Sequence, residues 1–294
     1  MQRIARHKLL ILPITLLCLL CIAQSQAADF SKGVLWEVSG KSNPPSYLLG
    51  TIHSDDPAVT AIPAPVQMVM LKVQSFTAEL DLDLGAMLEA QTQMMLPLDQ
   101  DLKTIIGQQR YDKAVELMSQ YGMPEMLVAR MKPWAIAAQL MMPRPTTGVF
   151  LDLKLFQQAQ GRGIPVYGLE TVAEQMGVFE KLTKQQQIAM LDQSLREHKN
   201  MPAMIKRLTR LYIQRDLAGL QRISDEQMRN TERGLANAME KNLINDRNVR
   251  MADRMEVRFK EGNALIAIGA LHLPGDNGVL HLLQQRGYRL KAIY

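Results

Sequence analysis

Two histidines, His53 and His272, follow apolar segments of the chain in the same local pattern, and such a pair could do chemistry. Residues 47–53 are YLLGTIH and residues 266–272 are IAIGALH, so each histidine comes three positions after a glycine that ends an apolar run. Such runs are typical of buried strands. A glycine where a strand leaves its sheet lets the backbone turn sharply or approach a ligand closely. We therefore expect the two imidazoles to reach one pocket; two structural histidines bonded to backbone are the alternative.

Two glutamates stand at the ends of two further predicted strands. Glu79 lies near the end of residues 75–80, SFTAEL, and Glu170 ends residues 164–170, IPVYGLE. In open α/β sheets the ligand binds beyond the carboxyl ends of the strands. The sequence therefore predicts that both glutamates lie along the same edge of a sheet as the two histidines.

Two imidazoles with one or two carboxylates are donors that suit a first-row divalent metal ion. Such an ion polarises a carbonyl and lowers the pKa of bound water toward ~7, which serves hydrolysis. One glutamate could act as general base or orient a histidine; without metal, one histidine could take a proton from water. The pattern leaves both versions open, and the chain has no His-Glu-x-x-His zinc motif. The candidate metal ligands are His53, His272, Glu79 and Glu170, and both glutamates are also candidate catalytic residues.

A later helical stretch contains Arg247 as a further candidate catalytic residue. Its guanidinium could stabilise an oxyanion or hold a substrate carboxylate. The alternative is an ion pair on the helix surface with Asp253 or Glu256. Of the other histidines, His198 is expected to be solvated at a charged helix end, and His281 could face the pocket or the solvent.

Strand and helix patterns alternate along the chain, which predicts an α/β fold with a mixed, mostly parallel sheet and helices packed on it. The predicted strands cover residues 34–38, 47–49, 75–80, 164–170, 263–268 and 288–293. A Met-rich helical insertion occupies about residues 84–163, where prolines divide it into short helices. Its methionines are expected to fill a core among packed helices. The alternatives are an adaptable apolar groove for a peptide or lipid-like substrate, and a methionine cluster that binds copper.

The first 27 residues have the pattern of a secretory signal peptide. A basic start precedes the apolar run 9–22, and Ser25 and Ala27 supply the small residues of a cleavage site. The run is shorter than the ~20 residues of a spanning helix. We therefore expect cleavage and no stable membrane insertion afterwards; a membrane anchor is the alternative. Both cysteines, Cys18 and Cys21, would leave with this segment, and a thiol-free exported chain suits a bacterial periplasm.

Residues 28–294 are expected to form a single α/β domain. With 47% hydrophobic and 21% charged residues, the chain can bury a full core. Loss of the three basic residues of the signal peptide would reduce the net charge from +5 to +2. Aromatic residues make up 5% of the chain and accompany no basic patch, so no nucleic-acid partner is expected.

Four stretches of the sequence resemble the TraB/GumN family: residues 47–53, 168–171 (GLET), 246–248 (DRN) and 268–275 (IGALHLPG). The resemblance spans nearly all of the mature chain, and the order of the motifs matches. The family includes the Tiki metalloproteases of animals, and its fold is similar to the erythromycin-esterase and ChaN-like group. For this chain the resemblance implies hydrolysis of peptide bonds with a divalent ion of the manganese or cobalt type; zinc is a further candidate.

The resemblance also implies roles for particular residues. The metal or catalytic positions would be His53, Glu79, Glu170 and His272, with Arg247 and Asn248 supporting them. The leading hypothesis is a periplasmic, metal-dependent hydrolase that acts on a peptide or another small-molecule substrate. The alternatives are a non-catalytic protein that binds a metal, haem or peptide at the same edge, and a metal-free esterase-like hydrolase.

Overall fold

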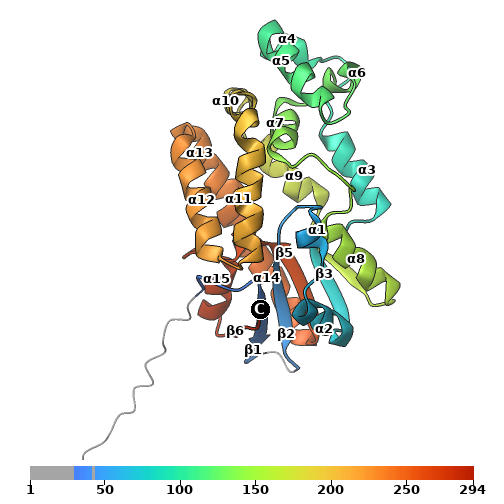
Figure 1. Cartoon of the computed structure of the whole chain (residues 1–294), viewed down its shortest axis with the longest axis vertical. Coiled ribbons are helices and arrows are strands. Elements are labelled where there is room, and N and C mark those ends of the chain that lie inside the picture. Colours follow the sequence, from blue (N-terminus) through green and yellow to red (C-terminus); the bar gives the residue numbers. More distant parts are fainter. Residues whose placement is uncertain (1–29, 42–43) are drawn as a thin grey trace, which may run out of the picture.

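Helices stand above one end of a sheet in the computed structural model of the protein, which describes residues 30–41 and 44–294 (Figure 1). The predicted signal peptide, residues 1–27, lies outside the described residues and stays a prediction. Within those two described ranges, no helix is both long and apolar enough to cross a membrane.

A six-stranded sheet forms the base of the molecule. Its strands are β1 (Leu35–Ser39), β2 (Ser46–Thr51), β3 (Ser75–Leu80), β4 (Val166–Glu170), β5 (Ala264–Gly269) and β6 (Arg289–Ala292). Their order across the sheet is β4-β3-β5-β2-β1-β6. Neighbours run parallel from β4 through β3 and β5 to β2, whereas β1 runs antiparallel to both β2 and β6. The mixed, mostly parallel sheet predicted from the sequence is confirmed.

Helices fill the connections between the strands. The first group is α1 (Pro57–Thr60), α2 (Ala64–Lys72), α3 (Leu84–Gln93), α4 (Leu102–Ile106), α5 (Gln108–Ser119), α6 (Glu125–Val128), α7 (Pro133–Met141) and α8 (Leu151–Gly161). The second is α9 (Val172–Glu180), α10 (Lys184–Glu197), α11 (Met201–Ile213), α12 (Leu217–Asn230), α13 (Arg233–Met239), α14 (Asp246–Glu261) and α15 (Val279–Gln285). Two 3₁₀ turns, η1 (His198–Asn200) and η3 (Ala270–His272), and a π-helix, η2 (Glu240–Asn245), complete the set.

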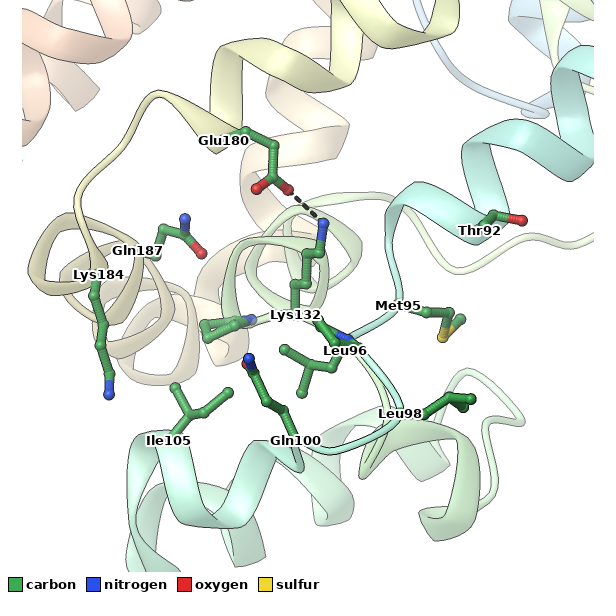
Figure 2. A pocket seen from close by; sticks show the side chains of 12 residues that line it. Thr92, Met95, Leu96, Leu98, Gln100, Ile105, Lys132, Glu180, Lys184 and Gln187 are labelled. Carbon is green, nitrogen blue, oxygen red and sulfur yellow. Dashed lines mark hydrogen bonds and ion pairs between the residues drawn. The ribbon is translucent and has the colours of Figure 1, made fainter.

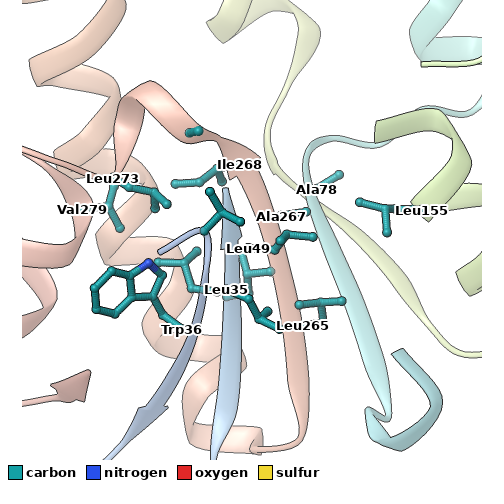
Figure 3. Packing of buried hydrophobic residues seen from close by; sticks show 14 of the residues in the cluster. Leu35, Trp36, Leu49, Ala78, Leu155, Leu265, Ala267, Ile268, Leu273 and Val279 are labelled. Atoms are coloured by element: carbon teal, nitrogen blue, oxygen red, sulfur yellow. The ribbon is translucent and has the colours of Figure 1, made fainter. Parts of the chain in front are cut away.

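Apolar side chains pack on both faces of the sheet (Figure 3). β5 is buried along residues 264–268, as expected for a central parallel strand covered on both sides. Trp36 of β1 is buried, and its Nε1–H donates to the Gly33 carbonyl at 3.0 Å. Helices α2, α8, α14 and α15 contribute buried residues to the same core. This packing fixes the positions at which the parallel strands end.

The helical region predicted at about residues 84–163 forms most of a second core. Helices α4 to α7 pack there with α10 around Trp134, whose Nε1–H donates to Glu180 Oε1 at 2.8 Å. Met118 and Met131 are buried in this core and act as core filler, whereas Met87, Met126 and Met141 are exposed, so the expectation holds for only some of the methionines. The predicted stretch also contains α8, which packs on the sheet instead, because its apolar face, including Leu155, joins the sheet core.

The glycines of the two histidine motifs are required for close packing rather than for a sharp turn. Neither Gly50 nor Gly269 has a positive φ. A Cβ at Gly50 would lie 2.6 Å from Leu273 Cδ1 and 3.1 Å from both the Cα and the Cβ of Ala270. The glycine of the first motif therefore lets β2 approach η3, the turn that carries His272 of the second motif.

Replacing Gly50 with alanine should destabilise the protein, because the new methyl group must displace Leu273 and Ala270. We expect the free energy of unfolding, measured by urea denaturation, to fall by about 1–3 kcal/mol. Gly177 in α9 is a matched control, since nothing lies within 4 Å of a Cβ built there. Gly177→Ala should leave stability unchanged or raise it by up to ~1 kcal/mol. Equal losses from both substitutions would contradict the packing role of Gly50.

Candidate functional site

Three residues predicted at the sheet edge meet through one buried arginine. Glu79 comes from the end of β3, Glu170 from the end of β4, and His272 from η3 directly after β5. Arg247, near the start of α14, contacts all three. Its Nη2 donates to Glu79 Oε2 and to Glu170 Oε2, each at 2.7 Å, and its Nη1 lies 3.3 Å from His272 Nε2. Arg247 is 4% exposed and is therefore not part of a helix-surface ion pair.

Glu170 is held by two guanidinium groups. Arg247 donates from Nε and Nη2 to Oε2 at 2.9 and 2.7 Å, and Arg250 donates from Nε and Nη2 to Oε1 at 3.0 and 2.6 Å. A carboxylate offers about four lone-pair positions, so these bonds occupy all of them. The Glu170 side chain has no exposed surface. In this arrangement it anchors the two arginines and has no lone pair left for a metal ion.

Hydrogen bonds fix the tautomer of His272. Asn248 Nδ2 donates to the Asn277 carbonyl at 2.7 Å, so its Oδ1 faces the ring and accepts from Nδ1–H at 2.6 Å. Nε2 then carries the lone pair, which accepts from Arg247 Nη1 at 3.3 Å, and it lies 3.9 Å from Glu79 Oε1. Burial is the main cause that lowers the pKa of His272 to about 4, so the ring is neutral near pH 7. A neutral imidazole with a carbonyl oxygen behind it is the form that binds metals or accepts protons.

Glu79 is ionised and keeps one free acceptor position. Its Oε2 accepts from Gln175 Nε2 at 3.0 Å and from Arg247 Nη2 at 2.7 Å, and its Oε1 accepts from the Gly269 N–H at 2.6 Å. Burial raises the pKa of Glu79, but His272 and Arg247 nearby, together with the Gly269 N–H, hold it below its ordinary value. One lone pair therefore remains on Oε1, the oxygen nearest to His272 Nε2.

His53 shares a pocket of about 350 Å³ with Glu79. Its side chain is 55% exposed, and its Nδ1 lies 3.5 Å from Asp152 Oδ2. Its ring stacks on Phe150 with 4.2 Å between the centroids. Thr51 Oγ1 donates to Asp152 Oδ1 at 2.6 Å, which fixes that carboxylate. The structure thus brings both histidine motifs to one end of the sheet, with His272 buried and His53 on an open wall.

Asp55, two residues after His53, ties this wall to a distant loop. Its Oδ2 accepts from the backbone N–H groups of residues 146–148 at 2.6, 2.6 and 3.1 Å. Burial raises the pKa of Asp55, but these bonds outweigh it and hold the pKa below its ordinary value. The loop leads directly into Phe150 and Asp152. Asp55 therefore fixes the segment that places a ring and a carboxylate on His53.

The donors fit a metal ion in part. Glu79 Oε1 and His272 Nε2 are 3.9 Å apart, a separation that two ligands of one ion can have when each lies ~2.0–2.2 Å from it. Glu170 does not fit, because the arginines occupy its oxygens. Among residues 30–41 and 44–294, no three His, Cys, Asp or Glu side chains lie close enough together to hold an ion. The pair of Glu79 and His272 is assembled, and the predicted four-ligand set is not.

A larger, open pocket of about 750 Å³ lies in the helical region (Figure 2). The Lys132 side chain extends toward Glu180, and its Nζ pairs with Glu180 Oε1 at 2.8 Å. Trp134 donates to the same oxygen, so this acid is already engaged. None of the residues that line this pocket comes from the sheet edge. The smaller pocket at the strand ends is the one that Glu79 and His53 line.

Sequence reasoning missed four residues of the site: Phe150, Asp152, Gln175 and Arg250. Arg250 could have been found, since a residue three positions after Arg247 lies on the same helix face. Asp152 and Gln175 lie in α8 and α9 with no motif around them. Only tertiary packing brings these two residues to the pocket of His53 and Glu79.

The remaining described histidines lie elsewhere. The prediction that His198 is solvated is wrong: it is 7% exposed and its Nδ1 lies 3.3 Å from the Leu140 carbonyl oxygen. The reason is that the helix ending at His198, α10, packs along α7. His281 is partly exposed on α15 and does not line the pocket of His53. Asp253, offered as a partner of Arg247, pairs with Arg286.

The buried neutral His272 makes the stability of the metal-free protein depend on pH. The unfolded chain protonates this histidine near pH 6.5, and the folded protein does so only near pH 4. The stability from this group is complete above pH 6.5 and is lost as the pH falls to about 4, by up to ~3 kcal/mol. Urea unfolding at a series of pH values, with a chelator present, measures this slope.

His272→Gln should flatten the slope between pH 6.5 and 4. His281→Gln is the matched control, since it removes a histidine outside the site, and it should keep the slope. A wild-type slope in the His272 variant would contradict a buried, neutral His272.

Comparison with known proteins gives the family and several relatives. The model of the TraB/PrgY/gumN family matches residues 34–292. The chain is 27% identical to metalloprotease TIKI1 of Homo sapiens, over 95% of this chain and 65% of the relative. It is 25% identical to metalloprotease TIKI2 of Danio rerio, over 87% of this chain and 60% of the relative. It is 28% identical to metalloprotease TIKI1 of Xenopus tropicalis, over 92% of this chain and 63% of the relative.

The chain thus spans less than two thirds of the length of these curated relatives. No solved structure matches it significantly. The matched family region contains all six strands of the sheet and every residue of the strand-end site. This chain belongs to the TraB/PrgY/gumN family.

Proposed function

We propose that this protein is a metal-dependent hydrolase of peptide bonds that acts in the periplasm or after secretion. Its distant similarity to proteins named metalloproteases supports a hydrolase-like role. The proposed location rests on residues 1–27, whose sequence has the pattern of a signal peptide. The observation that carries the chemistry is the pair of His272 Nε2 and Glu79 Oε1, 3.9 Å apart at the carboxyl edge of the sheet.

Glu79 and His272 would hold the divalent ion as a pair. We propose manganese or cobalt, with zinc as a further candidate, because carboxylate and imidazole donors serve all three. When bound, the ion would polarise the carbonyl of the scissile bond and lower the pKa of a bound water. Asn248 would orient His272 through the Nδ1–H bond, as carbonyl acceptors do behind metal-bound imidazoles. His53, which lies against Asp152 on the pocket wall, would have to turn away from that carboxylate to become a third ligand.

Arg247 would stabilise the negative charge that develops on the substrate oxygen. Its Nε and Nη2 are bonded to the two glutamates, and its Nη1 is directed at His272 Nε2. Nη1 is thus the part of the guanidinium that the two glutamates do not occupy, and its N–H groups would donate to the substrate oxygen. A donor already held in place by two carboxylates needs no reorganisation when charge develops. Glu170 would act through Arg247, as a positioning residue.

Removing either member of the central pair should abolish metal retention and hydrolysis together. We expect His272→Ala and Glu79→Gln to lower kcat/KM on a fluorogenic peptide library by about a hundredfold or more, since the lost group is a metal ligand. Metal content after incubation with Mn²⁺ or Co²⁺ is measured on the same samples. His281→Ala is the control and should retain both properties.

Unchanged metal content and activity in both variants would remove this proposal. Tight retention of metal or peptide without turnover, lost in the same variants, would instead indicate the non-catalytic binding protein.

One observation favours a second candidate, a metal-free hydrolase. Thr51, Asp152 and His53 form a chain in which a fixed carboxylate lies at ion-pair distance from an imidazole on the pocket wall. A histidine oriented by a carboxylate can take a proton from water or another nucleophile without a metal. His53 would then be the base, and Arg247 would again serve the oxyanion.

Exhaustive chelation separates the two candidates. For the metal-dependent enzyme, turnover should disappear and return when Mn²⁺ or Co²⁺ is added, and Asp152→Asn should cost about tenfold or less, as a residue that orients a ligand does. For the metal-free enzyme, turnover should survive chelation and fall by ~10²–10⁴ in Asp152→Asn. The exposed Asp225 supplies the control, Asp225→Asn, which should behave as wild type in both cases.

A further inference from the structure

A cavity of about 270 Å³ lies among helices α10 to α13 and the π-helix η2. Methionines from four of these elements line much of it: Met190, Met201, Met204, Met228 and Met239. We refer to it as the Met-lined cavity. Methionine side chains are flexible and polarisable, so such walls adapt to apolar groups of different shape. A dry cavity of ~150 Å³ already takes up benzene, and this one is larger.

Two segments of the chain connect the Met-lined cavity with the proposed active site. The first is the end of β5 with η3: Leu271 lines the cavity and His272 is the next residue. Gly269, the residue directly before this turn, lines the pocket of His53. Leu271 is 38% exposed, so its side chain is available to a ligand.

The second connecting segment is the π-helix before α14. Leu243 and Ile244 of η2 line the cavity, and Arg247 follows in the next turn. A π-helix is rare, and where it occurs it is frequently found at functional sites. A group bound in the cavity would thus touch both segments that hold the reacting groups in place.

The size and charge of the cavity favour a side chain over a free lipid. Its volume lies just below the ~300–1,000 Å³ of pockets that enclose a whole small molecule. Glu197 is one of the lining residues and would repel the carboxylate of a fatty acid. A single apolar side chain of a peptide is small enough for this volume and carries no charge for Glu197 to repel. The rest of that peptide could reach His272.

We propose that the Met-lined cavity is a specificity pocket that binds an apolar side chain of the peptide substrate close to the cleaved bond. This inference rests on the proposed function and adds a substrate class to it: peptides with leucine, methionine, isoleucine or phenylalanine at one defined position. Burial of such a side chain distinguishes it from a charged one by about tenfold or more in kcat/KM.

Binding can be measured without turnover, by NMR of protein whose methionine methyl groups carry carbon-13. We expect acetyl-Gly-Leu-Gly-amide to shift the methyl signals of the cavity methionines, and acetyl-Gly-Asp-Gly-amide to leave them in place. Met87 lines the pocket of His53 and serves as the internal reference for binding there alone. Shifts confined to Met87, equal shifts with both peptides, or shifts with dodecanoate and with neither peptide would overturn the proposal.

A matched pair of variants tests the location. Ser224 lines the cavity, and its neighbour Asp225 is exposed on the same helix. Ser224→Phe should fill the cavity, abolish the shifts produced by the leucyl peptide and reduce the preference for it at least tenfold. Asp225→Phe adds the same ring to the surface and should change neither. If Ser224→Phe does not fold, the NMR titration of the wild-type protein with the two peptides still tests whether the cavity binds an apolar side chain.

The two proposals can fail separately. Methyl shifts in a protein that hydrolyses no peptide would leave the cavity as a binding site and remove the hydrolase. Turnover with no preference for an apolar residue, and no shift at the cavity methionines, would keep the hydrolase and remove the specificity pocket.

Discussion

A single buried guanidinium holds the functional end of this molecule together. Arg247 bonds Glu79 from β3 and Glu170 from β4, and it touches His272 at the end of β5. A charge inside a protein is tolerated only when it is paired and its hydrogen bonds are satisfied. Loss of Arg247 would leave two carboxylates together without their shared counter-charge, so three strand ends depend on this one side chain.

The helix that supplies Arg247 extends the same principle along its length. Arg250 completes the bonding of Glu170, and Arg254 pairs with Glu174 in the first turn of α9. The hydrogen bond from Arg254 is the main cause that lowers the pKa of Glu174 to about 2. Thr171 caps the same turn, with reciprocal bonds between its side chain and the Glu174 residue. α14 therefore fixes the strand-to-helix turn that carries Glu170, which keeps the edge of the sheet rigid.

Rigid and open parts of the site come from different layers. The sheet edge holds Glu79 and His272 in a network of hydrogen bonds, whereas His53 stands half-exposed on a wall tied down by Asp55. Above them, the helices form a second core, and α10 to α13 with η2 surround the Met-lined cavity. For the proposed hydrolase, this arrangement would place a rigid hydrogen-bonded centre below an adaptable apolar layer that selects substrates by side-chain packing.

The sequence by itself determined the strands, their mixed and mostly parallel pairing, and the convergence of residues at the strand ends. Apolar runs separated by helical stretches specify buried parallel strands, and the carboxyl ends of such strands share one edge. The pattern of residue types is therefore enough to place Glu79, Glu170 and His272 near one another. The family followed from short motifs in a fixed order, and the family model bears it out.

Only the tertiary structure decided how these groups share their hydrogen bonds. Arg247 lies 77 positions from Glu170 and 168 from Glu79, so its choice of partners depends on packing and not on local pattern. That choice leaves Glu170 with no free oxygen and gives Glu79 the open lone pair. The burial of His198, the stacking of Phe150 on His53 and the role of Asp152 have the same origin. Periodicity along a chain fixes which face a residue occupies, but the competition among donors and acceptors is settled only when distant segments meet.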